Sequence, residues 1–205
     1  MEPQTLLSDT LRAQTYKVLA ECFYAPDDEL MALLREVSES PSDFIRQIAK
    51  VADDATELEP LRVDHAKLFV GPYKLLAPPY GSVYLEDGKL MGQSTIQVKS
   101  LYSEEGLDFV LREAPDHVSV ELEFMCLLIN RTIEAVNRSD YDEEHSYRQK
   151  QRSLLAGHFG QWVPAFAAKV EDAAKTDFYR TLGKVTRRFV EDDLTELCRL
   201  DQESG

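Results

Sequence analysis

The stretch PDHVSVELEFMCLLINRTIEAV, Pro115–Val136, is the most apolar helical pattern in the sequence. Its hydrophobic residues fall nearly all the way round a helix, which is typical of a helix buried on all sides. Pro115 and Asp116 form a start signal, because proline is tolerated in the first turn and aspartate accepts backbone N–H groups there. We therefore predict a buried central helix around which the remaining chain packs.

Most of the chain on either side of this stretch repeats its apolar residues with helical spacing. Further helices are predicted at about residues 5–24, 27–37, 43–51, 60–69, 94–106, 140–157, 163–174 and 177–200. Ser94-Thr95 is expected to cap one of them, and a break is expected at residues 157–164. Strand patterns are missing, apart from a short extended piece predicted at Ser82–Leu85. The sequence thus predicts an all-α fold, a single-domain helical bundle over residues 1–205.

One long segment, at about residues 70–93, interrupts the helical pattern. Four of the nine glycines and three of the nine prolines fall within Leu68–Gly92, with apolar and aromatic residues between them. Loops of this length are uncommon and are usually functional or disordered, and the apolar content favours an ordered loop. Tyr73, Tyr80 and Tyr84 fit two roles equally well: anchors that pack back on the bundle, or part of a groove for an apolar peptide.

The charge of the chain is strongly negative. There are 23 lysines and arginines and 37 aspartates and glutamates, a net charge of −14, and residues 1–92 and 93–205 each carry −7 of it. Nucleic-acid binding depends on basic residues that neutralise phosphates, so this charge argues against a nucleic-acid partner. It suits a cationic partner and also favours solubility.

Three features predict a cytoplasmic protein. The N-terminus has no basic segment followed by an apolar core, so it does not read as a secretory signal peptide. No run of about 18 apolar residues occurs, which predicts no membrane span. The cysteines Cys22, Cys126 and Cys198 lie far apart among apolar neighbours and are expected to be buried free thiols.

The segment Glu113–His117 opens the central helix, where Asp116 is well placed as a cap. His117 and Glu121 are four residues apart and so share one helical face. With Asp116, and Ser82 as a nucleophile, they would suit a small metal-dependent or Asp/His hydrolase. Two ligands do not make a metal site, however, and no G-x-S-x-G motif surrounds the serine. We therefore predict no metal and no catalytic residue, and keep the hydrolase as the alternative.

Several blocks of sequence resemble the TorD/DmsD-type (NarJ-related) redox-enzyme maturation chaperones. They are DHAKLFVGP (64–72), APPYGSVY (77–84), EAPDH (113–117), ELEFM (121–125) and HFGQWVPAF (158–166). The resemblance covers nearly the whole chain, and the second and third blocks together are specific. Many members have tyrosine at the position of His65 and Glu-Ser at the position of Gly81-Ser82. The difference at Gly81-Ser82 places this chain nearer the dimethyl-sulfoxide-reductase branch of the family, but it does not identify the enzyme that the chaperone would bind.

The resemblance implies an all-helical chaperone with no catalytic activity and no cofactor of its own. Such proteins bind the twin-arginine signal peptide, and sometimes the body, of a molybdopterin-containing oxidoreductase. They hold it in the cytoplasm until its cofactor is inserted, before export. By position, the client-binding residues would be His65, Leu68, Phe69, Pro79, Tyr80, Gly81, Ser82, Asp116 and His117.

The family also allows a monomer or a dimer that swaps helices across a hinge in the loop at 70–93. Weak guanine-nucleotide binding by some relatives leaves a nucleotide-responsive regulatory protein as a second alternative, although no phosphate-binding glycine motif occurs. An acidic protein with an apolar groove would suit two guanidiniums followed by an apolar stretch. The glycines and prolines of the loop would then shape one wall of that groove.

Overall fold

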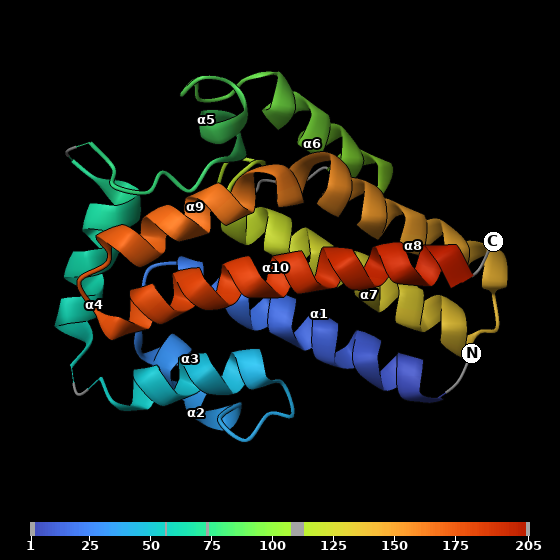
Figure 1. The fold of residues 1–205 in the computed structure, drawn as a ribbon, viewed down its shortest axis with the longest axis horizontal. Coiled ribbons are helices and arrows are strands. Elements are labelled where there is room, and N and C mark those ends of the chain that lie inside the picture. Colours follow the sequence, from blue (N-terminus) through green and yellow to red (C-terminus); the bar gives the residue numbers. More distant parts are fainter. Residues whose placement is uncertain (1–2, 56, 73, 108–112, 204–205) are drawn as a thin grey trace.

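The computed structural model describes residues 3–55, 57–72, 74–107 and 113–203, with side chains from residue 8 to residue 199 (Figure 1). This part of the chain is helical, and its one β-type contact is an isolated bridge between Tyr80 and His117. The α-helices are α1 Pro3–Phe23, α2 Asp28–Glu36, α3 Asp43–Asp53, α4 Leu58–His65, α5 Gly81–Leu85, α6 Gln93–Glu104, α7 Val118–Asn137, α8 Tyr141–Leu154, α9 Gly160–Ala173 and α10 Asp177–Glu203. Two π-helical turns, η1 Ala66–Val70 and η2 Leu155–Phe159, follow α4 and α8 directly. The all-α prediction is confirmed.

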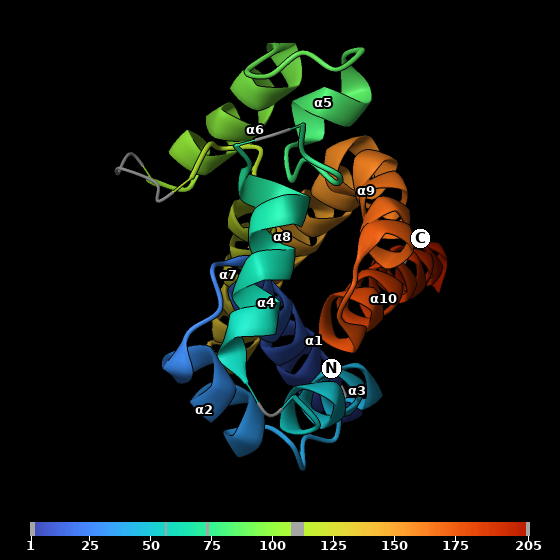
Figure 2. The same ribbon diagram turned by 90° about the vertical axis from the view of Figure 1, so that its left-hand side faces the viewer.

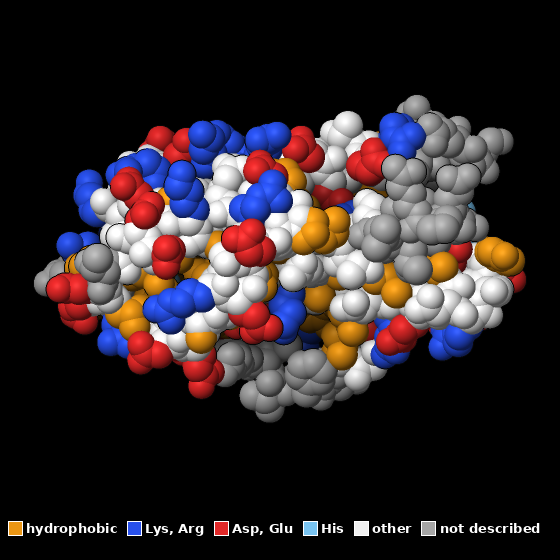
Figure 3. Space-filling view, turned by 90° about the horizontal axis from the view of Figure 1, so that it is seen from below, with side chains coloured by type: hydrophobic (Ala, Val, Ile, Leu, Met, Phe, Trp, Pro, Cys, Tyr) orange, Lys and Arg blue, Asp and Glu red, His pale blue; other side chains and the backbone are white. Residues whose placement is uncertain are grey.

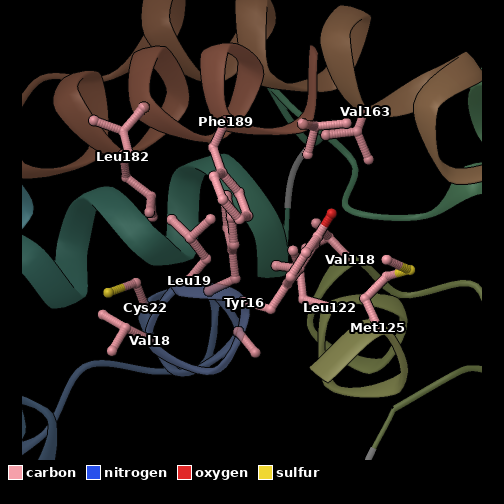
Figure 4. Close-up of a cluster of buried hydrophobic side chains, with 14 of the residues drawn as sticks. Tyr16, Val18, Leu19, Cys22, Val118, Leu122, Met125, Val163, Leu182 and Phe189 are labelled. Carbon is pink, nitrogen blue, oxygen red and sulfur yellow. The ribbon is translucent and has the colours of Figure 1, made fainter. Parts of the chain in front are cut away.

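The core lies between the five longest helices of the described chain, α1, α7, α8, α9 and α10. Helix α7 packs against α1 and α8, and α9 packs against α10. In Figure 4, Tyr16 of α1, Leu122 of α7 and Phe189 of α10 point toward one another in one cluster of buried side chains. Eleven of the twenty residues of α7 are buried, which confirms a central helix, but Glu123, Asn130, Arg131 and Glu134 are exposed, so α7 is not buried on all sides. Burial of such side chains, at about 25 cal/mol per Å² of apolar surface, is the main force that holds the bundle together.

Two pairs of shorter helices lie on opposite sides of these long helices. Figures 1 and 2 both place α2 and α3 at one edge of the molecule and α5 and α6 at the other. Helix α3 packs on α10 and on α2, whereas α5 packs on α9 and on α6. Helix α5 lies within the long segment that interrupts the helical pattern, and α6 follows that segment directly; together they form a separate layer, which rests on α9 through α5.

Several local predictions were wrong. Ser82–Leu85 is not extended but lies in α5, which is capped by a side chain distant in sequence. Ser94-Thr95 does not cap α6, since Gly92 precedes the helix and the carboxylate of Glu86 accepts the N–H groups of its first two residues. The chain does not break at residues 157–164, because η2 joins α8 to α9 without interruption. Pro164 lies inside α9, where a proline has no backbone N–H to donate to the carbonyl four residues earlier.

The cysteines differ from one another in burial. Cys22 is fully buried, and burial raises the pKa of its thiol. Cys126 and Cys198 are only partly buried, so the prediction of three buried thiols was wrong for these two. Both lie on helices that keep one side toward solvent. Among the described residues, no helix is long and apolar enough to cross a membrane.

Candidate functional site

The two most specific sequence blocks lie against each other in the structure. The N–H of Gly81 donates to the carbonyl of Asp116 at 2.8 Å, and the N–H of Val118 donates to the carbonyl of Pro79 at 2.9 Å. These two bonds flank the Tyr80–His117 bridge. The loop and the start of the central helix are thereby fixed to each other by backbone contacts.

Asp116 caps α5 and not α7, which corrects the prediction for this residue. Its Oδ2 accepts the N–H of Ser82 at 2.9 Å, and its side chain is buried. His117 takes the N-cap position of α7 instead, and its Nδ1 accepts the N–H of Ser119 at 3.2 Å. The chain stays extended at His117, so the carboxylate one residue earlier faces the neighbouring helix start. Gly81 is favoured here, because a Cβ at this position would lie 3.0 Å from Nε1 of Trp162 and the indole would have to move by a few tenths of an ångström.

His117 lies between two tyrosine rings. Tyr80 meets it edge-on at a centroid distance of 5.3 Å, and Tyr24, at the end of α1, stacks on it at 6.3 Å. Burial lowers the pKa of His117 to about 4, against an opposing effect of Asp116 and with a smaller contribution from the charge of His65. The imidazole is therefore neutral near pH 7, as its role as a hydrogen-bond acceptor in the cap requires. We call Tyr80, His117 and Tyr24 the aromatic row.

The residues predicted on the helix before the loop belong to a buried cluster. His65 lies edge-on to Phe69 at 5.2 Å, and Phe69 in turn meets Phe23 of α1 at 5.8 Å. The ring nitrogen Nε2 of His65 lies 3.3 Å from the carbonyl oxygen of Phe23. Leu68 is also fully buried. The π turn η1 widens the helix where Leu68 and Phe69 turn inward, and π turns are frequent near functional sites.

The structure thus brings the nine predicted binding residues into one region, but most of their side chains are inaccessible. His65, Leu68, Phe69, Pro79, Ser82, Asp116 and His117 are buried, as is the glycine at position 81. Tyr80 is partly exposed. These residues form the framework of the region, and any direct contact with a bound peptide falls mainly to their exposed neighbours.

One such neighbour is an acidic groove beside the aromatic row. Its volume is about 710 Å³, and it lies between the end of α1, the start of α2 and the segment before α7. Four carboxylates and one ammonium group line it, together with apolar side chains: Glu21, Asp27, Glu29, Glu113, Lys17, Tyr24, Ala25, Leu30 and Leu33. Glu113 is close enough to the aromatic row that its charge, after burial, raises the pKa of Tyr80. We call this feature the acidic groove.

A second polar group lies beneath α5. The carboxylate of Glu121 is fully buried and meets Nε2 of His158 at 3.0 Å. Burial raises the pKa of Glu121, and Glu121 raises the pKa of His158 although burial opposes that change. Within the described residues, Glu121 Oε2 and Trp162 Nε1 are buried and neither forms a hydrogen bond of ordinary geometry. The indole N–H of Trp162 is nevertheless near enough to the carboxylate of Glu121 to lower its pKa slightly, against the larger effect of burial.

The residues of the hydrolase alternative do not form one site: His117 belongs to the aromatic row, whereas Glu121 belongs to the buried pair with His158. The accessible imidazole nitrogen that a general base requires is not available at His117, whose Nδ1 is engaged in the helix cap. Glu121 pairs with His158 and not with His117. Among the described residues, no three His, Cys, Asp or Glu side chains are grouped so that they could hold a metal ion.

Two parts of this region were not found from the sequence. Tyr24 and the acidic groove were missed, because their residues come from three separate segments and no pairwise spacing joins them. The closest signal was Glu113, which occurs in the EAPDH block. Of the loop tyrosines, Tyr84 stacks on Trp162 at 5.7 Å and so packs back on the bundle, whereas Tyr73 lies outside the described residues.

Comparison with known proteins places these features in a family. The sequence profile of the nitrate reductase delta subunit family matches residues 23–168, which is more than half of the chain. This range includes the aromatic row, the acidic groove from Tyr24 onward and the Glu121–His158 pair.

Individual relatives carry chaperone names. A Tat proofreading chaperone DmsD from Salmonella typhi is 34% identical over 124 residues, which cover 59% of this chain and 54% of the relative. A chaperone protein TorD from Vibrio cholerae is 26% identical over 173 residues, which cover 83% of this chain and 77% of the relative. The first match thus spans about half of the length of the DmsD protein. A crystal structure from Archaeoglobus fulgidus, named as a redox enzyme maturation protein, has a TM-score of 0.56 at 26% identity and covers 88% of this chain and 93% of its own.

Proposed function

We propose, on the premise that this chain belongs to the nitrate reductase delta subunit family, that it is a maturation chaperone for a molybdopterin-containing oxidoreductase. In this role it binds the twin-arginine signal peptide of the enzyme in the cytoplasm and withholds it from export until the cofactor is inserted. The chaperone names of the DmsD and TorD relatives and the fold shared with a redox enzyme maturation protein support this role. The chain itself performs no chemistry in this proposal.

The acidic groove is the observation that carries the proposal. It presents four carboxylates to one lysine, and Lys17 is already paired with Glu21 at 3.8 Å. Two consecutive guanidiniums are a good match, because arginine pairs with carboxylates through several hydrogen bonds in a fixed geometry. Leu30 and Leu33 on the same wall give the arginine stems an apolar surface.

The aromatic row extends the groove toward the loop. Tyr24 lines the groove and stacks on His117, and His117 contacts Tyr80, which is partly exposed. A signal peptide continues from its arginines into an apolar stretch, and an aromatic surface next to the acidic groove provides apolar contacts for it. Of the nine residues predicted from the family, the buried ones fix the position of the aromatic row, and the partly exposed Tyr80 contacts the peptide.

The proposal is tested by calorimetric titration with a synthetic 20-residue peptide that has two consecutive arginines followed by an apolar stretch. Glu29→Gln and Glu113→Gln should each weaken binding several-fold and reduce its salt dependence, because a charge that attracts the arginines is removed. Tyr24→Ala should cost more than about 1 kcal/mol of binding free energy, as aromatic anchors do.

The matched control is Asp142→Asn, which removes an exposed charge on α8, distant in sequence from the groove. It should leave the affinity unchanged. A peptide whose two arginines are replaced by alanine should bind weakly to the wild-type protein and show little salt dependence. Equal affinity for both peptides, or equal losses in Asp142→Asn and Glu113→Gln, would contradict recognition of arginines by the acidic groove.

A further inference from the structure

The segment before α7, which brings Glu113 to the acidic groove, is a hydrogen-bonded turn. The N–H of His117 donates to the carbonyl of Ala114 at 2.9 Å and closes the turn. Pro115 occupies the second position of the turn, where its fixed φ is favourable. The contacts of Asp116 described above join the second half of the turn to α5. This half is therefore fixed without any contribution from α6.

The first half of the turn is held by α6. The hydroxyl of Tyr102 donates to the carbonyl of Pro115 at 2.7 Å. In the described part of the chain, this is the one hydrogen bond that joins Glu113, Ala114 or Pro115 to a residue outside the turn. The backbone that carries Glu113 thus depends on a side chain from a helix that does not line the acidic groove.

Tyr102 is itself held in place by its surroundings. Its side chain is buried, and its ring meets Phe124 of α7 edge-on at a centroid distance of 4.5 Å. Burial raises the pKa of its hydroxyl well above the usual value, and the charges of Glu121, Asp116 and Glu123 raise it further. The hydroxyl therefore stays protonated near pH 7 and remains a hydrogen-bond donor.

The position of single carboxylates matters, because charge alone does not mark the groove. On the face seen in Figure 3, acidic and basic side chains alternate around apolar patches. Of the four carboxylates in the groove, Glu21 is paired with Lys17 at 3.8 Å, and Asp27 caps α2. Glu29 and Glu113 have no partner among the described residues. Two carboxylates are thus left for the two guanidiniums of a twin-arginine peptide.

We infer that Tyr102 is a positioning residue of the acidic groove, which holds Glu113 at the separation from Glu29 that two consecutive arginines require. This inference rests on the proposed function. Glu29 lies in the first turn of α2, and Figures 1 and 2 place α2 and α6 at opposite edges of the molecule. The two carboxylates are therefore held by separate parts of the bundle. Without the hydroxyl of Tyr102, the turn can shift and Glu113 meets its arginine less well.

A purely structural role for Tyr102 predicts a different result. Loss of its hydrogen bond would then lower the free energy of unfolding and leave the affinity of the folded protein unchanged. The positioning role predicts a loss of affinity that acts through Glu113. Removal of the hydroxyl and removal of the Glu113 charge should then not be additive.

The inference is tested by a double-mutant cycle of Tyr102→Phe and Glu113→Gln, titrated calorimetrically with the synthetic twin-arginine peptide. Phenylalanine keeps the ring contact with Phe124 and removes only the hydroxyl. Tyr102→Phe should weaken binding by about threefold or more and reduce its salt dependence. The double variant should bind within about twofold of Glu113→Gln alone. Circular dichroism at the temperature of the titration verifies that each variant is folded.

The matched control is Tyr147→Phe, which removes a tyrosine hydroxyl on α8, outside the groove. Tyr147 is partly buried, and Nζ of Lys150 lies 5.1 Å from the centre of its ring, a contact that phenylalanine keeps. Affinity and salt dependence should equal those of the wild type. Equal losses of affinity in Tyr147→Phe and Tyr102→Phe would overturn the inference.

The outcomes separate the inference from the proposed function. If Glu29→Gln and Glu113→Gln both bind the peptide as tightly as the wild type, recognition of arginines by the groove fails, and Tyr102 has no contact to position. If Glu113→Gln weakens binding while Tyr102→Phe does not, the inference is wrong and the proposed function stands. The same holds if the losses in the two single variants simply add in the double variant.

Discussion

Two buried polar clusters in this protein differ in how completely their atoms are paired. The Arg12 cluster joins α1, α8 and α10. Arg12 donates to both carboxylate oxygens of Asp193, to Asp9 at 2.8 Å and to Gln151 at 3.0 Å. Tyr16 adds a hydroxyl donor to Asp193 at 2.8 Å. Both oxygens of Asp193 are therefore satisfied, and Gln151 continues the network to a threonine of α7.

The Glu121 cluster joins α5, α7, η2 and α9, and its pairing is incomplete. Ser82 Oγ, Asp116 Oδ1, Glu121 Oε2 and Trp162 Nε1 are buried without a hydrogen bond of ordinary geometry in the described residues. The carboxylate of Glu121 has one partner, His158. Because a buried polar atom without a partner costs stability, such atoms are rare and call for an explanation.

This difference in hydrogen bonding suggests that the two clusters have different roles. A completely paired network fixes the relative positions of the helices that it joins, and the Arg12 cluster holds the long helices of the bundle. The incompletely paired network lies directly below the loop and the aromatic row, where the candidate site is. Stability is lower than it could be at this place, as is common where structure serves binding.

The largest expected effect is in the Arg12 cluster. Asp193→Asn should lower the free energy of unfolding by about 3–5 kcal/mol, because Arg12 loses its main counter-charge while it stays buried. Denaturant unfolding monitored by circular dichroism measures this change. Asp192→Asn is the control at the adjacent position, where the side chain is exposed and 3.6 Å from Arg188. It should cost less than about 0.5 kcal/mol, and similar losses in both variants would show that the network is not structural.

The bundle could be predicted from the sequence, but these networks could not. Helical spacing located the long helices and the buried α7, because the burial of one face dominates the energetics of a helix. Arg12 and Asp193 are 181 positions apart, so no local pattern pairs them. Helix α5 was missed for the same reason: its cap, Asp116, is 34 positions away from Ser82.

The candidate site was predicted in part. The family blocks identified segments that the structure brings together, including the bridge of Tyr80 and His117. A resemblance to a family does not reveal which of these side chains are exposed, and most of them are buried. The acidic groove depends on the packing of α1 against α2 and on Glu113, and this arrangement exists only in three dimensions.

The second expected effect concerns pH. The pKa of His117 is about 4 in the folded protein and about 6.5 in the unfolded chain, so the unfolded chain binds more protons between these values. The free energy of unfolding should therefore fall as the pH is lowered from 6.5 to 4, by up to about 3 kcal/mol from this residue. His117→Asn keeps a good N-cap and removes the titration. Its unfolding free energy should depend less on pH over this range.

Part of the pH dependence will remain in His117→Asn, because burial also lowers the pKa of His65. A His117→Asn profile parallel to the wild type would mean that His117 is not buried in its neutral form.

The third expected effect is at the cap of α5. Asp116→Ala should lower the free energy of unfolding by about 1 kcal/mol, because the N–H of Ser82 loses its acceptor. Asp116→Asn should cost less, since an amide oxygen can still accept this bond. Thermal unfolding of both variants gives the comparison. Equal losses would show that the negative charge, and not the hydrogen bond, is what stabilises this position.

The smallest effect is expected for Glu121→Gln, which makes the same chemical change as Asp193→Asn in the other cluster. The amide oxygen of Gln can accept from Nε2 of His158 as one carboxylate oxygen does now, at 3.0 Å. The substitution removes a buried charge that also repels Asp116, which is why burial and Asp116 both raise the pKa of Glu121. We therefore expect a change below about 1 kcal/mol, in the stabilising direction.

The direction in which the stability difference between Glu121→Gln and the wild type changes with pH follows from the pKa of Glu121. Because the pKa of Glu121 is higher in the folded protein than in the unfolded chain, the folded protein binds more protons above pH 4.5. The contribution of Glu121 to stability is thus greatest at low pH and falls as the pH rises through its folded pKa. Glu121→Gln lacks this fall, so its advantage over the wild type should grow toward neutral pH. If Glu121→Gln lowered the free energy of unfolding at pH 7 as much as Asp193→Asn does, both clusters would stabilise the fold equally. There would then be no reason to connect the unpaired atoms of the Glu121 cluster with binding.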